Sequence, residues 1–103
     1  MADDVFAALA NPVRRRLLEL LAEGSRTAGA LAEPFALSRP AVSEHLAVLR
    51  KAGLVREHAS GRERHYHLDA GPLADVDAWL HPFERYWRDR LRSLSESLEE
   101  DPS

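Results

Sequence analysis

The sequence contains no cysteine among its 103 residues. Disulfide bonds, thiolate metal sites and cysteine-based redox sensing are therefore excluded. It also lacks any apolar run approaching the ~20 residues that a membrane-spanning helix needs. Its start, MADDVF, is acidic and has neither the basic nor the apolar region of a secretory signal. We therefore expect a protein that acts in the cytoplasm and not at a membrane.

Internal repeats, low-complexity runs and a glycine-rich phosphate loop are missing as well. A chain of 103 residues with 45% apolar composition can bury one small core, which predicts a single domain over residues 1–103. Such a core is marginal alone, so dimerisation would contribute to its stability.

The net charge is −3, but the charges are unevenly distributed along the chain. Residues 12–68 carry 10 basic and 6 acidic side chains, a balance of +4. Residues 1–11 balance at −2, and residues 69–103, with 4 bases and 9 acids, balance at −5. Because DNA binding depends on local field and counterion release, the acidic total counts only weakly against it.

The stretch SRPAVSEHLAVLRKAGLV at residues 38–55 predicts an amphipathic helix. Ser38 can cap its start, Pro40 suits its first turn, and Gly53 suits the left-handed conformation that often ends helices. At about 100° per residue, one face packs and the other is presented to solvent. The packed face holds Val42, His45, Leu46, Leu49 and Ala52, and the presented face holds Arg39, Pro40, Ser43, Glu44, Ala47, Arg50 and Lys51. A presented face of this kind is typical of a recognition helix that enters a DNA groove.

Three shorter helices are predicted before this one. The first starts at Asp3 or Asp4, and the second starts at Asn11-Pro12 and runs to Gly24. The third starts at Ser25 or Thr27 and ends by Pro34, so that its turn into residue 38 makes a helix-turn-helix. The second helix also carries three successive arginines at residues 14–16, of which at most two can reach one phosphate backbone; solvated first-turn charges are the alternative.

After Gly53 the pattern alternates, which predicts a hairpin with strands at residues 54–58 and 64–68 and a turn at residues 59–63. Tyr66 and Leu68 share one face and are expected to lean on the core. Arg62 and Arg64 lie at or beside the tip, where they can reach a phosphate or the minor groove. A charged tip that is merely solvated is the alternative.

The last helix is expected from about residue 72 to residue 100, and its apolar side chains recur at spacings of three and four. A helix of ~29 residues is ~43 Å long, which is more than so small a core can cover. We therefore predict that it forms a dimer interface with the first helix, although cover over the chain's own core is the alternative. The predicted interface comprises Phe6, Leu9, Trp79, Leu80, Phe83, Trp87, Leu91 and Leu94. Pro82 either bends this helix or starts a second one.

Three motifs occur in order: S-x-P-A-V-S-x-H-L at residues 38–46, L-x-x-A-G-L-V at 49–55 and G-R-x-R-x-Y at 61–66. With FAALANPVRRRLLELLAEG near the start, they resemble the winged helix-turn-helix repressors of the ArsR/SmtB family, and within it the cysteine-free SdpR-like branch. The resemblance implies a mainly α fold with a small β-hairpin wing, dimeric through the N- and C-terminal helices. It also implies a homodimeric repressor, or autorepressor, that binds a palindromic operator in double-stranded DNA.

Residues 12–68 would then form the DNA-binding core. Arg39 is the candidate for a guanine edge, and Glu44 either accepts from cytosine N4 or repels phosphates. His45 matches the family's motif, but it falls toward the packed side, so a structural role is preferred. The predicted DNA-binding residues are Ser38, Arg39, Pro40, Ser43, Glu44, His45, Ala47, Arg50, Lys51, Arg62 and Arg64.

Two alternatives to simple DNA binding are a metal-responsive repressor and a protein-interaction module. A nickel- or zinc-responsive repressor would need histidine and carboxylate ligands, and His65 with His67, or His81 with Glu84, are the candidates. The Asp-x-His pair that such a site takes in the family is missing, so we predict no metal and no cofactor, and any small-molecule effector is left unassigned. A protein-interaction module using the aromatic helix is the other alternative. Ser43, Glu44 and His45 are consecutive and splay apart on a helix, so no enzyme is expected.

Overall fold

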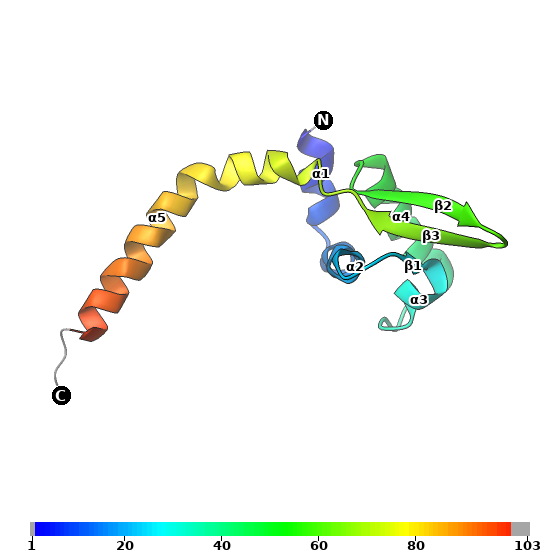
Figure 1. Cartoon of the computed structure of the whole chain (residues 1–103), viewed down its shortest axis with the longest axis horizontal. Coiled ribbons are helices and arrows are strands. Elements are labelled where there is room, and N and C mark those ends of the chain that lie inside the picture. Colours follow the sequence, from blue (N-terminus) through cyan, green and yellow to red (C-terminus); the bar gives the residue numbers. More distant parts are fainter. Residues whose placement is uncertain (1, 100–103) are drawn as a thin grey trace.

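The computed structural model describes residues 2–99 and shows five helices and three strands. In chain order these are α1 (Ala2–Leu9), α2 (Pro12–Ala22), β1 (Arg26–Thr27), α3 (Ala28–Ala32), α4 (Arg39–Lys51), β2 (Val55–Ser60), β3 (Glu63–Leu68) and α5 (Leu73–Glu99). The first four helices and the sheet gather into one body, from which α5 projects (Figure 1). The predicted class, mainly helical with a small sheet, is confirmed.

Polar side chains begin the helices where the sequence predicted them. Asn11 Oδ1 accepts from the backbone N–H of Val13 at 2.8 Å, and Ser38 Oγ accepts from that of Ala41 at 3.3 Å. Each bond satisfies a donor that has no partner within its own helix. Gly53, which follows the C-cap residue Ala52 of α4, has a φ of +79°, as predicted for a residue that ends a helix.

The core lies where α1, α2, α3 and α4 meet the sheet. Its buried side chains are Val5, Ala8, Leu17, Leu18, Leu20, Leu21, Leu31, Val42, Leu46, Leu49, Leu54, Val55 and Tyr66. Helices α2 and α4 supply seven of these 13 side chains, because each helix places its large apolar residues on one face. Tyr66 and Leu68 lean on this core, as the hairpin pattern predicted.

The sheet is antiparallel in the order β1-β3-β2, and its β2–β3 hairpin is called the wing below. Ser60 pairs with Glu63, which leaves only Gly61 and Arg62 in the turn. Gly61 has a φ of +64°, the left-handed conformation that such two-residue hairpin turns need and glycine tolerates. The predicted five-residue turn was therefore too long, because the strands continue through polar residues to the tip.

Strand β1 was not predicted. It pairs Arg26 with Tyr66 and Thr27 with His65, which turns the hairpin into a three-stranded sheet. Next to it, the Ser25 hydroxyl donates to the carbonyl of Tyr66 at 2.9 Å. A strand of two residues has no alternation that a sequence pattern can reveal.

Two of the arginines at the start of α2 bind the end of α1. Arg14 Nε donates to the carbonyl of Ala8 at 2.7 Å, and Arg15 Nη1 donates to that of Leu9 at 2.7 Å. Carbonyls in the last turn of a helix lack partners and carry partial negative charge, so guanidinium groups are favourable there. Arg14, which is half-buried, therefore has a structural role, whereas Arg15 makes its bond while it stays exposed to solvent.

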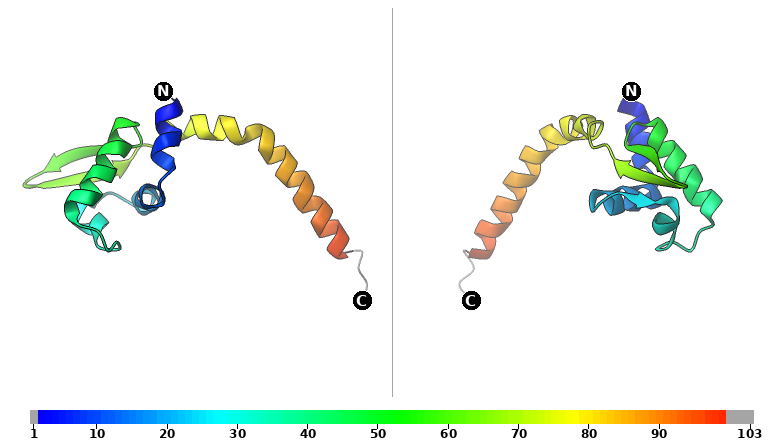
Figure 2. Two further views of the ribbon diagram at one scale, coloured as in Figure 1. Left: turned by 180° about the vertical axis from the view of Figure 1, so that it is seen from behind. Right: turned by 45° about the vertical axis from the view of Figure 1, so that its right-hand side comes forward.

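Helix α5 is a single helix of 27 residues with Pro82 in its interior. The two further views show that it bends and leads away from the rest of the chain (Figure 2). The Cα radius of gyration is 18.4 Å, against about 13 Å for a compact domain of this length. Of the two outcomes predicted for Pro82, the bend is confirmed and the second helix is wrong. Within residues 2–99, no helix is both long and apolar enough to cross a membrane.

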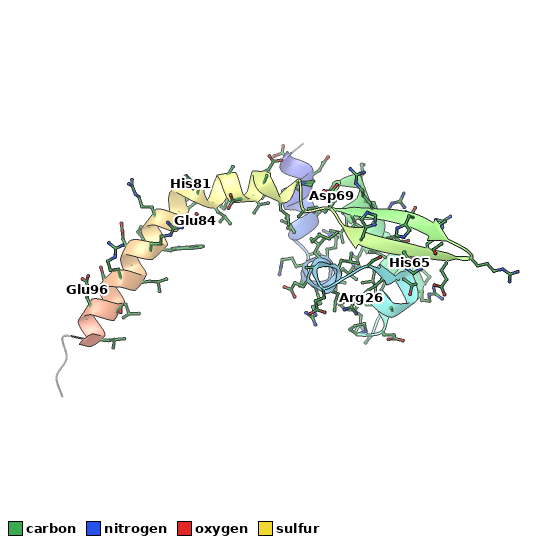
Figure 3. The ribbon with its side chains drawn as sticks, in the orientation of Figure 1. Arg26, His65, Asp69, His81, Glu84 and Glu96 are labelled. Atoms are coloured by element: carbon green, nitrogen blue, oxygen red, sulfur yellow. The ribbon has the colours of Figure 1, made fainter. Side chains whose placement is uncertain are left out.

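Asp69 joins the wing to α5 (Figure 3). Its Oδ1 accepts from the N–H of Gly71 at 3.0 Å, and its Oδ2 accepts from Arg56 Nε at 2.8 Å. The Gly71 N–H first, and then Arg56, lower the pKa of this carboxyl below its ordinary value of 3.8. The charged carboxylate thereby favours the folded state.

The junction therefore predicts a pH effect on stability. A carboxyl whose pKa is lower in the folded than in the unfolded chain stabilises the fold above the unfolded value and ceases to do so as pH falls through the folded value. We expect the melting temperature of Asp69→Asn to lie below that of the unchanged chain at pH 7, with a gap that narrows below about pH 4. Melting curves from pH 7 to pH 3, with the exposed Asp77→Asn as control, measure this, and a gap independent of pH would contradict it.

Candidate nucleic-acid interface

Helix α4 presents the ridge that the sequence predicted. Arg39, Ser43, Ala47 and Arg50 follow one another at spacings of four, four and three, and all are exposed. Leu46 and the other buried side chains of this helix, Val42 and Leu49, lie on the opposite face. The exposed set Arg39, Ser43, Ala47 and Arg50 is called the α4 ridge below. Packing on one side thus fixes which side chains are offered on the other.

A hollow lies between the α4 ridge, the start of α3 and the wing. Its lining comprises Thr27, Ala28, Gly29, Arg39, Ser43, Arg62, Glu63, Arg64 and Tyr66. Three of these residues are arginines and only one is acidic, so the hollow favours an anion such as a phosphate backbone. The structure brings together residues of the recognition helix and of the wing tip, which lie about 20 positions apart in the sequence. The contribution of β1 and α3 had no signal in the sequence.

At its far end the α4 ridge meets the wing through an acidic side chain. Glu57 Oε1 lies 3.0 Å from Arg50 Nη1 and 3.7 Å from Arg64 Nη1. Tyr66 faces the same group: burial first, and then the negative charge of Glu57, raise the pKa of its hydroxyl above 10. Because this pKa is higher in the folded than in the unfolded chain, the free energy of unfolding should fall as the pH rises above about 10.

A second row runs along the exposed side of α4. Pro40, Glu44, Val48 and Lys51 follow one another at spacings of four, four and three. Val48 was assigned to neither face by the sequence, and its side chain is 40% exposed. Its spacing from Glu44 and Lys51 was the signal that would have placed it there. Valine methyl groups in this row suit contact with a thymine methyl.

The predicted dimer surface divides into two parts. Near the body, the Phe6 ring meets the edge of Trp79 at 5.8 Å between centroids, and Leu9 packs on the core. Leu80 is half-buried. The chain itself therefore covers these residues in part, which agrees with the alternative prediction that the last helix covers the chain's own core. Trp79 itself is still 57% exposed, and beyond it the large exposed apolar residues of α5 are Phe83, Tyr86, Trp87, Leu91, Leu94 and Leu98.

Tyr86 was not among the predicted interface residues. It is 53% exposed, and the guanidinium of Arg90 lies 4.7 Å from its ring centroid. Exposed apolar groups on this scale are uncommon on a monomer and mark contact surfaces. These side chains form an exposed apolar stripe on the outer part of α5.

Known proteins share this architecture and much of the sequence. The sequence profile described as bacterial regulatory protein, arsR family, matches residues 11–57. The transcriptional repressor SdpR of Bacillus subtilis is 38% identical over 76% of this chain and 87% of its own length. The chain belongs to the ArsR family.

Further ArsR relatives extend the match over almost the whole chain. The HTH-type transcriptional regulator Rv2034 of Mycobacterium tuberculosis is 37% identical over 96% of this chain and 90% of its own length. The crystal structure of an ArsR family transcriptional regulator has a TM-score of 0.73 and 35% identity, covering 84% of this chain and 89% of that one. The predicted family and winged fold are confirmed, and as an ArsR member this chain is a DNA-binding transcriptional regulator.

His45 departs from the predicted DNA-binding set. It is half-buried, and its Nδ1 lies 3.4 Å from Arg14 Nη1, whose guanidinium also donates to the α1 carbonyls. The side chain therefore packs between helices, behind the α4 ridge, as its place on the helical wheel indicated. This packing agrees with the structural role preferred for His45, and its contact with DNA stays a prediction. Ser38 is exposed, but its hydroxyl is engaged by the helix start.

The histidines do not support the metal-responsive alternative for this ArsR protein. His65 and His67 share a face with His58, whose ring centroid lies 5.5 and 5.4 Å from theirs. The rings of His58 and His65 are stacked within 20° of parallel, so their nitrogens do not converge on one point. His81 lies on α5, far from His65 on the sheet (Figure 3). Among residues 2–99, no three potential ligands are arranged to hold a metal ion.

Proposed function

We propose that the chain is a homodimeric repressor that occupies a roughly palindromic operator in double-stranded DNA. It would act in the cytoplasm, without an enzymatic step or a cofactor. The observation that carries this proposal is the hollow in which Arg39 of the recognition helix and Arg62 and Arg64 of the wing come together. The related repressor SdpR supports repression as the direction of control.

Two parts of the chain would divide the work. Residues 12–68 form the DNA-binding core, and α5 pairs with α5 of a second copy through its exposed aromatic stripe. A dimer presents two α4 helices to successive major grooves, about 34 Å or one helical turn apart. Repression then follows from occupancy of the promoter, and an operator upstream of the protein's own gene would make it an autorepressor.

Individual roles follow from side-chain chemistry and position. Arg39 begins the α4 ridge and suits a bidentate contact to guanine, while Ser43 can bond a base or a phosphate. Glu44, on the second row, suits cytosine N4. Pro40, Ala47 and Val48 offer apolar surface to thymine methyl groups. The phosphate contacts are assigned to Arg50, Lys51, Arg62 and Arg64.

Fluorescence anisotropy of the full chain on DNA from upstream of its gene, against scrambled DNA of equal length, tests the proposal. We expect Arg39→Ala to weaken operator binding by about 1–3 kcal/mol and to relax the preference over scrambled DNA. Arg62→Ala, at the exposed tip, should weaken both DNAs similarly and reduce the slope of log affinity against log salt by about one.

The two substitutions act as controls for each other, because each removes one arginine from the same hollow. Equal loss of preference from both would contradict the division between base and phosphate contacts. An unchanged chain that binds operator and scrambled DNA alike would contradict sequence-specific repression itself.

A further inference from the structure

Glu57 stands out as an acidic side chain at the edge of a surface otherwise suited to DNA. It lies on β2 opposite Tyr66, on the face of the wing that meets α4. Its side chain is only 20% exposed, whereas those of Arg50 and Arg64 are 45% and 71% exposed. The carboxylate is therefore nearly enclosed, while both guanidinium groups reach solvent.

The contacts of Glu57 are unequal. Its Oε1 is paired with Arg50 at 3.0 Å and, more loosely, with Arg64 at 3.7 Å. Its Oε2 is buried and has no hydrogen-bond partner within the part of the chain that the structure describes. Burial first, and then the charge of Glu57, raise the pKa of the Tyr66 hydroxyl. Burial of a carboxylate is compensated by the groups that face it, which here are Arg50 and Arg64 and also the Tyr66 hydroxyl, whose interaction with Glu57 contributes to its raised pKa.

Arg50, at the end of the α4 ridge, and Arg64, on the wing, are two of the four residues assigned to phosphates. A guanidinium that is already paired with a carboxylate neutralises a phosphate less effectively and releases fewer counterions on binding. The same pairing joins the end of the recognition helix to the wing.

We propose that Glu57 is a positioning residue that acts through Arg50 and Arg64. It holds the two guanidinium groups in the DNA-free protein and competes with phosphates for them, which limits affinity for DNA of any sequence. Readout by Arg39 and the rest of the α4 ridge then accounts for a larger share of the binding energy. This inference rests on the proposed DNA-binding function.

The test is the salt dependence of DNA binding by Glu57→Gln, measured with the full chain on scrambled DNA. Each additional phosphate neutralised steepens the slope of log affinity against log salt by about 0.9. Glu57→Gln should therefore bind like the unchanged chain near 1 M salt and roughly eightfold more tightly at 0.1 M salt. Its preference for operator over scrambled DNA should not increase.

Glu63→Gln is the matched control. Glu63 lies on the same hairpin and lines the same hollow, but its ion-pair partner is His65 at 3.3 Å and not an arginine. The substitution Glu63→Gln removes one negative charge near the DNA, as Glu57→Gln does. A slope that is steeper in Glu57→Gln than in Glu63→Gln supports the proposal. Equal slopes, or weaker binding by Glu57→Gln at an unchanged melting temperature, overturn it.

A second pair of variants keeps the test independent of the folding of Glu57→Gln. Because Arg50 is already paired, Arg50→Gln should reduce the salt slope less than Arg62→Gln, whose arginine stands at the exposed tip. Equal reductions would overturn the proposal. If the unchanged chain prefers its operator and the slopes are equal, only this inference fails; if it shows no preference, the proposed function fails.

Discussion

A chain carrying Trp87→Glu and Leu91→Glu is expected to be a monomer at concentrations at which the unchanged chain is a dimer. The two side chains are 55% and 66% exposed and lie on the outer part of α5, where the chain's own body does not cover them. In a two-fold symmetric pair each change occurs twice, so four apolar side chains are lost from one interface. Burial of each contributes about 1.5–3 kcal/mol, and an unpaired carboxylate in its place opposes association further.

Loss of the dimer should also weaken operator binding. A monomer reaches one half-site, whereas the second half-site of a dimer is engaged at a high effective concentration, and we expect affinity to fall by at least about 100-fold. Sedimentation equilibrium gives the assembly state, and anisotropy on the operator gives the affinity.

Arg85→Gln with Arg92→Gln is the control for charge. These exposed residues also lie on α5 but outside its apolar stripe, and the change in net charge is the same, −2. The control pair should remain dimeric. An interface role for α5 would be refuted by a dimer that survives the two glutamates, or by an unchanged chain that is already monomeric at tens of micromolar.

The recognition helix shows why some of this fold was predictable from the sequence. Residues 38–52 were expected, and α4 is Arg39–Lys51, because a long apolar period, a capping serine and Gly53 agree on one element. The same periodicity placed His45 on the packed side correctly. Local signals were enough here, since each depends on residues within a few positions of one another.

The missed features depend instead on contacts between distant elements. Arg14 and Arg15 read as charges on α2, but their acceptors are carbonyls of α1, six or seven residues earlier, and are reached only at the observed angle between the helices. The role of Glu57 depends likewise on how closely the wing approaches Arg50. A sequence pattern gives the face on which a side chain lies, not the partner that another element brings to it.

Leu49→Ala is expected to lower the free energy of unfolding by about 2–5 kcal/mol. Leu49 is fully buried and lies on the packed face of α4 with Val42 and Leu46. Truncation leaves a cavity that the surrounding helices fill only in part. Since the free energy of unfolding of a small domain is ~5–15 kcal/mol in total, this single change removes a large fraction of its stability. Chemical denaturation at fixed protomer concentration measures it, because dimerisation makes stability depend on concentration.

Val48→Ala, one residue earlier, is the matched control for this prediction. Its side chain is 40% exposed, so little apolar surface leaves the core, and alanine is the better helix former. We expect its stability to change by less than about 1 kcal/mol. Comparable losses from both variants would mean that the packed and presented faces of α4 are not distinct.

Below its melting temperature, Leu49→Ala should still bind the operator, because the α4 ridge is untouched. Arg39→Ala, in contrast, should have an unchanged melting temperature and bind the operator weakly. The two faces of one helix therefore separate stability from DNA recognition.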